Sequence, residues 1–95
     1  MRLSYHPGAE AELVDAAEYY EERLTGLGEV FLDAVDAAVG VVASDPLRAA
    51  LCGQGVRRYL LKRFPYALYY RAGSEETRIL AVKHHSRHPD YWKNR

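Results

Sequence analysis

The sequence predicts an α+β domain in which a helical hairpin packs on one face of a mostly antiparallel four-stranded sheet, in the order β-α-α-β-β-β. Three observations predict this class. Apolar residues recur at helical spacing through the first half, they alternate with a period of two after residue 56, and short turn segments join the later strands. With 95 residues and one cysteine, a single domain over residues 1–95 without an internal disulfide is expected.

Residues 2–24 are predicted to form a short strand and then a helix. Arg2–His6 alternates polar and apolar residues, as a strand does, and Pro7-Gly8 ends this pattern. Pro7 also suits the first turn of a helix, where its missing N–H costs nothing. Apolar residues then recur at the spacing of one buried stripe: Ala9, Leu13, Ala16, Ala17, Tyr20 and Leu24. The helix is expected to end at Gly26-Leu27-Gly28.

A second helix is predicted from Glu29 to about Ala43. Its apolar stripe consists of Phe31, Val35, Ala38 and Val42. Asp45-Pro46 ends it, because the residue before a proline is pushed out of the helical region. Two amphipathic helices joined by a short glycine turn form an antiparallel hairpin, which needs a third layer to bury both stripes.

The third layer is predicted after a loop at residues 47–55. Three segments rich in Tyr, Leu, Ile and Val follow, at residues 56–63, 66–71 and 77–84. Because the turns between them are short, they are expected to pair as an antiparallel meander, joined by the N-terminal strand. The helices cover one face of this sheet, so the other face is expected to be open.

Charge is distributed unevenly, although the formal net charge is zero. Residues 1–45 carry ten acidic and two basic side chains, whereas residues 46–95 carry eleven basic and three acidic ones. One interpretation is that the basic half contacts an anionic partner, either nucleic acid or an acidic protein segment. The other is that the two halves neutralise each other across the fold.

The segment from His84 to Arg95 contains the residues best suited to chemistry. Three of the four histidines, two arginines, a tyrosine and the only tryptophan lie in these twelve residues. Histidine exchanges protons near neutral pH, arginine holds phosphate, and aromatic rings stack on bases, which suits RNA cleavage or strand binding. The alternative is that Pro89, Tyr91 and Trp92 pack the segment on the sheet while the histidines stay exposed.

No metal site or cofactor site is expected. His84 and His88 are four residues apart, but no cysteine or carboxylate pair completes a tetrahedral ligand set. Cys52 has no base near it in the sequence and is interpreted as a small packing residue. No glycine-rich phosphate loop precedes a helix.

A cytoplasmic location without membrane contact is expected from the start of the chain. Residues 1–7 lack the apolar run of a signal peptide. No stretch approaches the ~20 apolar residues that span a bilayer.

Several short motifs occur along the chain in a characteristic order: Ala9-Glu10-Ala11-Glu12-Leu13, Tyr19-Tyr20-Glu21, Gly28-Glu29-Val30-Phe31, Asp45-Pro46, Arg57-Arg58-Tyr59-Leu60-Leu61, Phe64-Pro65-Tyr66, Tyr69-Tyr70 and the run from His84 to Trp92. In their order and spacing, these motifs resemble the RelE/ParE superfamily of type II toxin–antitoxin toxins, also called plasmid stabilisation proteins. The resemblance implies a bacterial toxin that arrests growth and is neutralised by a cognate antitoxin, whose segment folds on binding.

The two branches of this superfamily imply different targets. RelE-like members are ribosome-dependent, metal-independent mRNA endonucleases, and their basic or tyrosine site residues match Arg58, Arg87 and Tyr91. These members carry an arginine where this chain has Ala67, so a nuclease would need a substitute such as Arg58, Arg87 or His85.

ParE-like members inhibit DNA gyrase, and the Phe64-Pro65-Tyr66 and Arg87-His88-Pro89 motifs are closer to that branch. The favoured hypothesis is therefore gyrase inhibition without catalysis. The residues expected to contact the target are Arg58, Arg63, Arg87, Tyr91 and Trp92. An mRNA endonuclease, and an inactive remnant that only binds its antitoxin, remain as alternatives.

Overall fold

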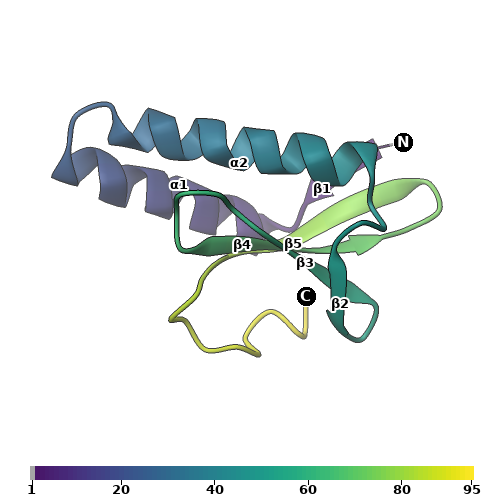
Figure 1. Ribbon diagram of the computed structural model, residues 1–95. Coiled ribbons are helices and arrows are strands. Elements are labelled where there is room, and N and C mark those ends of the chain that lie inside the picture. Colours follow the sequence, from purple (N-terminus) through teal and green to yellow (C-terminus); the bar gives the residue numbers. More distant parts are fainter. Residues whose placement is uncertain (1) are drawn as a thin grey trace.

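Residues 2–95, which the computed structural model describes, fold into a helical hairpin on one face of a single sheet (Figure 1). The helices are α1 (Pro7–Arg23) and α2 (Leu27–Ser44). The strands are β1 (Arg2–Tyr5), β2 (Ala50–Gly53), β3 (Val56–Leu60), β4 (Tyr66–Ala72) and β5 (Glu76–His84), in the spatial order β1-β5-β4-β3-β2. β1 runs parallel to β5, and the other neighbours are antiparallel. The predicted α+β class is confirmed.

The sheet has five strands in the described residues, so the predicted count of four is wrong. The additional strand, β2, lies within the segment expected to be a loop. It pairs with β3 through a tight turn in which Gly53, Gln54 and Gly55 all have positive φ angles of 116°, 54° and 73°. Such turns need residues that tolerate the left-handed region. A four-residue strand with a register irregularity gives too short a pattern to recognise in the sequence.

The hairpin turn explains why α2 begins at Leu27, two residues earlier than predicted. The Glu21 carboxylate accepts hydrogen bonds from the backbone N–H groups of Gly26, at 2.9 Å, and Gly28, at 3.0 Å. It thereby satisfies donors that a helix N-terminus leaves unpaired. A Cβ atom on Gly28 would lie 2.6 Å from the Ala17 carbonyl oxygen, so glycine permits the close approach of the two helices.

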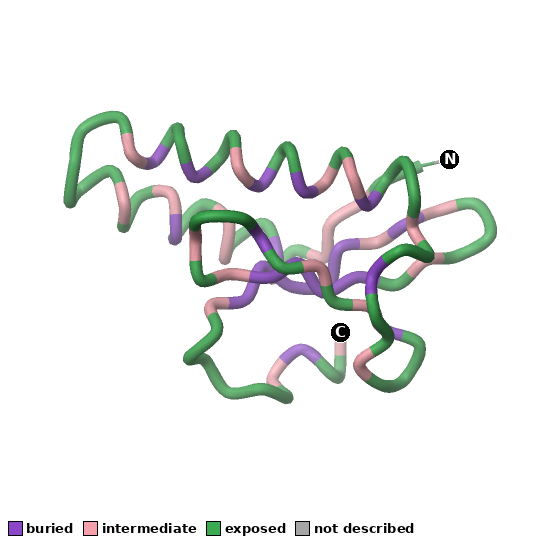
Figure 2. Tube along the Cα trace, in the orientation of Figure 1, coloured by how far each residue is buried: buried purple, intermediate pink, exposed green. Residues whose placement is uncertain are grey.

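Two apolar clusters lie on the two faces of the sheet. The helix-facing core contains Ala9, Ala16, Phe31, Val35, Ala38, Val42, Ala49, Leu61, Leu68, Tyr70, Ile79 and Val82. The open-face cluster contains Val56, Ala67, Tyr69, Leu80, Ala81 and Trp92. Figure 2 shows buried residues along both helices, through the strands, and within the chain segment below the sheet. Both faces of the central strands are therefore covered over part of their length.

Candidate functional site

Residues 85–95, here called the C-terminal segment, cross the face of the sheet opposite the helices (Figure 1). Trp92 anchors the segment: it is only 3% exposed, and its ring centroid lies 5.0 Å from that of Tyr69. Its indole N–H is buried and has no hydrogen-bond partner among residues 2–95. The segment is thus held to the sheet by an aromatic side chain that the sequence analysis had placed at the target contact.

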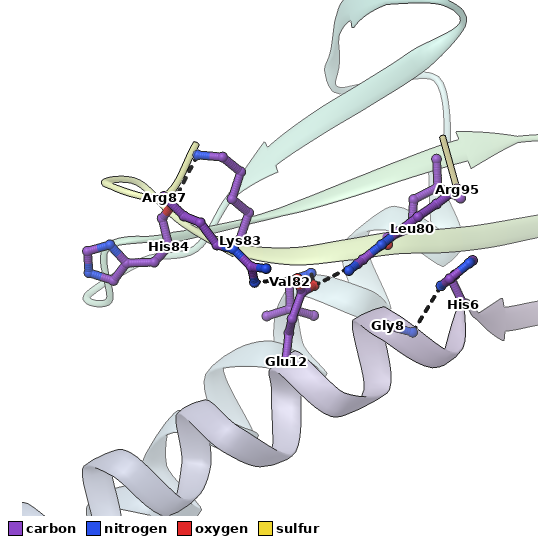
Figure 3. Close-up of polar contacts among 9 residues, drawn as sticks. All are labelled: His6, Gly8, Glu12, Leu80, Val82, Lys83, His84, Arg87 and Arg95. Carbon is purple, nitrogen blue, oxygen red and sulfur yellow. Dashed lines mark hydrogen bonds and ion pairs between the residues drawn. The ribbon is translucent and has the colours of Figure 1, made fainter. Parts of the chain in front are cut away.

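The Glu12 carboxylate, on α1, joins the C-terminal segment to the rest of the fold (Figure 3). One oxygen accepts a hydrogen bond from Arg87 at 2.8 Å, and the other accepts one from Arg95 at 3.0 Å. The second oxygen also accepts the backbone N–H of Val82, at 3.0 Å. The Glu12 side chain is only 10% exposed, so these charge-assisted bonds are poorly screened by water. We call this arrangement the Glu12 clamp.

The clamp forms where the edge of β5 is left open by the short strand β1. β1 pairs with β5 only as far as Ile79, so the backbone groups beyond it need other partners. The Glu12 carboxylate accepts a hydrogen bond from the Val82 backbone N–H, and Arg95 donates one to the Leu80 carbonyl oxygen at 3.0 Å. A Cβ atom on Gly8 would lie 2.5 Å from the Arg95 guanidinium carbon, so the arginine passes over α1 at a glycine. Side chains therefore replace the missing strand.

Tyr91 is enclosed by the same charged groups. The Arg87 guanidinium stacks over its ring at 3.7 Å, and Arg95 lies 5.1 Å from the ring centroid. The hydroxyl is buried beside the Glu12 carboxylate and makes no hydrogen bond of regular geometry to any of residues 2–95. Burial, followed by the proximity of Glu12, raises the pKa of Tyr91 well above its ordinary value. The hydroxyl stays protonated at neutral pH and is not available there as a base.

Three histidines stabilise local turns. The Nδ1 atoms of His6, His84 and His88 each accept the backbone N–H two residues further on, at 2.9, 3.0 and 3.2 Å. Because a backbone N–H only donates, Nδ1 is the unprotonated nitrogen in each ring. The His85 imidazole is exposed and makes no hydrogen bond within residues 2–95. The alternative prediction, in which Pro89, Tyr91 and Trp92 pack on the sheet while the histidines stay exposed, is confirmed for Trp92, His85 and His88 but wrong for Pro89, which is exposed.

Lys83 is a basic residue that the sequence analysis did not single out. It is 4% exposed and points to the open face, where its ammonium group donates to the His84 carbonyl oxygen at 3.1 Å. Burial, and then the nearby Arg58 and Arg87, lower the pKa of Lys83. It lies directly opposite Ala67 in the pairing of β4 with β5. A cationic group therefore stands across from the position where the resemblance would place an arginine.

The remaining predicted site residues lie apart from the clamp. Arg58 is exposed on the open face and forms no ion pair within residues 2–95. Arg63 lies in the β3–β4 turn with a positive φ of 74°. It lines a groove of about 430 Å³ between α2 and β3, on the helix side of the sheet. The predicted set is thus divided between the C-terminal segment, the open face and this groove.

Potential metal ligands are scattered across the described residues. Within residues 2–95, no group of three or more His, Cys, Asp or Glu side chains is placed to hold a metal ion. The half-buried Cys52 thiol donates to the Val56 carbonyl oxygen at 3.4 Å, and burial raises its pKa. Neither α1 nor α2 combines the length and apolar character needed to cross a bilayer.

Charge separation between the halves of the chain becomes separation between layers. The acidic half forms β1 and the two helices, and the basic half forms β2 to β5 and the C-terminal segment. Among acidic residues of the first half, Glu12 alone forms an ion pair within residues 2–95. Contact between the halves therefore neutralises little of the basic layer.

Glu12 is the main residue that the sequence analysis missed. Its signal was its position: it lies within the apolar stripe of α1, three residues after Ala9 and four before Ala16, both buried. A carboxylate on a buried stripe needs partners. Its partners come from residues 82, 87 and 95, about 70 or more positions away in the chain.

Three comparisons relate the chain to known proteins. Residues 3–89 match the family model described as the ParE toxin of a type II toxin–antitoxin system, parDE. The chain is 31% identical over 93 residues to Toxin ParE2 of Mycobacterium tuberculosis, which covers 94% of this chain and 86% of that protein. A solved structure of a chromosomal ParDE system from P. aeruginosa is 27% identical and superimposes with a TM-score of 0.66, covering 88% of this chain and 95% of that one.

Proposed function

Because the chain belongs to the ParE toxin family of type II toxin–antitoxin systems, we propose that it arrests growth by binding and inhibiting DNA gyrase. The observation that carries this proposal is the Glu12 clamp, which ties the C-terminal segment, with its basic residues Arg87, Lys93 and Arg95, to the rest of the fold. Arg87 keeps 51% of its side chain exposed although it is paired with Glu12, Arg58 is also exposed, and both arginines lie near Lys83. These two arginines are the first candidates for the target contact.

The other expected contact residues have supporting roles in this proposal. Trp92 and Tyr91 hold the segment in place, since the indole is buried and the Tyr91 ring lies under Arg87. A truncation that removes residues 90–95 would delete both anchors together with Arg95. Reduced toxicity of such a truncation could then follow from a damaged fold and not from a lost target contact. Single substitutions of exposed arginines therefore test the contact better than truncation does.

A binding role suits the protonation states and pairing of the clamp. A nuclease needs groups free to accept a proton and to hold the transition-state phosphate. The Tyr91 hydroxyl is buried with a raised pKa, and Arg87 is already paired with a carboxylate. Ala67, at the position of the expected arginine, is 1% exposed. These features favour a toxin that acts by contact.

The experiment is a DNA supercoiling assay with purified gyrase and the purified protein. We expect the protein to inhibit supercoiling, with Arg58→Ala and Arg87→Ala each raising the inhibitory concentration tenfold or more, about 1.4 kcal/mol of binding. Arg48→Ala is the matched control, because Arg48 is exposed in the loop before β2 and belongs to none of the proposed surfaces. If Arg58→Ala and Arg87→Ala both inhibit supercoiling as strongly as the parent protein, the assignment of these arginines to the gyrase contact is wrong.

Pulse-labelling separates the possible targets in cells that make the protein without its antitoxin. Thymidine incorporation should fall first, before methionine incorporation. An earlier fall in methionine incorporation would favour the ribosome. No fall in either, with soluble protein present, would favour an inactive remnant.

Lys83 favours the mRNA endonuclease as the second candidate. Its ammonium group faces the side of the sheet that carries Arg58, and its lowered pKa suits proton exchange. If mRNA is cut, Lys83→Ala, Arg87→Ala and His85→Ala should abolish cutting while antitoxin binding survives. Cutting that survives all three changes would remove this candidate's site.

The groove between α2 and β3 is the surface proposed for the cognate antitoxin that this family implies. Most of its lining is apolar, with Val30, Ala34, Val41 and Tyr59 among the residues. Two cationic side chains, Lys62 and Arg63, and one carboxylate, Asp33, also line the groove, and none of the three forms an ion pair within residues 2–95. An amphipathic, acidic antitoxin segment fits this chemistry. Ala34→Arg should abolish antitoxin binding while leaving toxicity intact.

A further inference from the structure

A second basic feature lies on the open face, at the end of the sheet where β4 turns into β5. It is an open hollow of about 380 Å³, here called the arginine hollow. Its lining comprises four arginines, two glutamates and the β4–β5 turn: Arg2, Arg71, Arg78, Arg95, Glu75, Glu76, Gly73, Ser74 and Leu80. None of the residues proposed to contact gyrase lines it.

Arg71 and Arg78, which both line the hollow, are direct partners in the pairing of β4 with β5. Like charges directly opposite each other on neighbouring strands are destabilising. Neither arginine forms an ion pair within residues 2–95. Arg71 donates to the Gln54 carbonyl oxygen and Arg78 to the Ser4 hydroxyl, each at 3.1 Å. Each guanidinium keeps further N–H donors available.

The carboxylates of the hollow compensate only part of this charge. Glu76 accepts the Ser4 hydroxyl at 2.8 Å and lies 3.9 Å from Arg2, so it faces β1. Glu75 is exposed and forms no ion pair within residues 2–95. Arg95 is fixed at the rear by Glu12 and the Leu80 carbonyl. Because Arg2 faces Glu76 and Arg95 is paired with Glu12, only Glu75 remains to balance Arg71 and Arg78, which leaves an excess of positive charge in the hollow.

We propose that the arginine hollow binds a phosphate group between Arg71 and Arg78. A phosphate supplies the negative counter-charge that Arg71 and Arg78 lack. The planar guanidinium group of each arginine can donate two parallel hydrogen bonds to it. The Ser74 hydroxyl, on the turn that borders the hollow, is a further donor. The phosphate of a nucleic-acid backbone and that of a small phosphorylated molecule share this chemistry.

Calorimetric titration of the full chain with inorganic phosphate tests the site itself. We expect one phosphate per chain, with affinity reduced tenfold or more in the Arg71→Ala/Arg78→Ala double variant. Arg71→Lys/Arg78→Lys keeps the charge but removes the forks, so its affinity should lie between the two. The matched control, Arg23→Ala/Arg48→Ala, removes two exposed arginines outside the hollow and should bind like the parent.

Titrations with a fluorescent DNA duplex and with a nucleoside triphosphate identify the source of the phosphate. If the hollow binds a nucleic-acid backbone, the duplex should bind with a salt dependence whose log–log slope weakens by about 0.9 for each phosphate that a variant no longer neutralises. The Arg71→Ala/Arg78→Ala variant should show this change and the control pair should not. Tight triphosphate binding with no duplex binding would assign a small molecule instead.

Two results would overturn the proposal. One is the absence of binding by all three probes when thermal unfolding shows that the parent chain is folded. The other is an equal loss of affinity in the Arg71→Ala/Arg78→Ala and control pairs, since that would mean a general charge effect. Neither depends on gyrase inhibition, so this site and the proposed function can fail separately.

Discussion

On the helix side of the sheet, twelve buried residues from both helices and several strands form one continuous core, whereas the open-face cluster has six, and one of them is Trp92. The helix side spreads its stabilisation over many contacts along long elements. The open side depends on Trp92 and on one carboxylate, Glu12, whose partners lie in residues 82–95. Single substitutions should therefore act globally on the first side and locally on the second.

The largest effect on stability is expected from Phe31→Ala. Phe31 is fully buried, and its ring lies 5.0 Å from that of Tyr66 and 5.1 Å from that of Phe64. Removing such a side chain costs about 3–5 kcal/mol in lost burial and cavity formation. Urea unfolding followed by circular dichroism measures it. Leu32→Ala, at the neighbouring 38% exposed position, is the control, and an equal loss there would contradict the account.

Trp92→Ala should have the next largest effect, about 3 kcal/mol, at the lower end for a buried tryptophan because its cluster is small. The effect should be local: amide protons of the C-terminal segment should exchange faster while those of α1 and α2 stay protected. Hydrogen exchange resolved by residue measures both. If the amide protons of α1 and α2 exchange faster to the same extent as those of the C-terminal segment, the two faces of the sheet are not stabilised independently.

The contrast between the faces also explains what the sequence could predict. Phe31, Val35, Ala38 and Val42 repeat at helical spacing, so the second helix and its buried face followed from local pattern. Glu12 and Arg95 are also buried or half-buried, but each carries a charge whose partner lies far along the chain. No short window holds that information, because the clamp exists only once β5 and α1 are side by side.

Glu12→Gln tests the clamp with a smaller change. The amide keeps the shape and one acceptor, but Arg87 and Arg95 lose their counter-charge, which should cost about 1–3 kcal/mol. Since Trp92 is the only tryptophan, its fluorescence reports docking of the segment, and we expect a shift to longer wavelength. Asp15→Asn, an exposed acid on the same helix, should leave the emission unchanged. A red shift in both variants would point to helix charge in general.

Tyr91→Phe should have the smallest effect at neutral pH, within about 1 kcal/mol, because the hydroxyl makes no hydrogen bond of regular geometry within the described part of the chain, residues 2–95. Its effect should grow in alkali. Burial and Glu12 raise the folded-state pKa above the ordinary value of 10.0, so the associated stability is fully present below that pH and is lost as pH rises further. Because the unfolded chain ionises there first, the parent should lose more stability above pH 10 than Tyr91→Phe does. Unfolding free energies at neutral and alkaline pH measure the difference. Parallel pH profiles would show that the hydroxyl is better solvated than its place beside Glu12 implies, and the clamp would then depend on the two arginines alone.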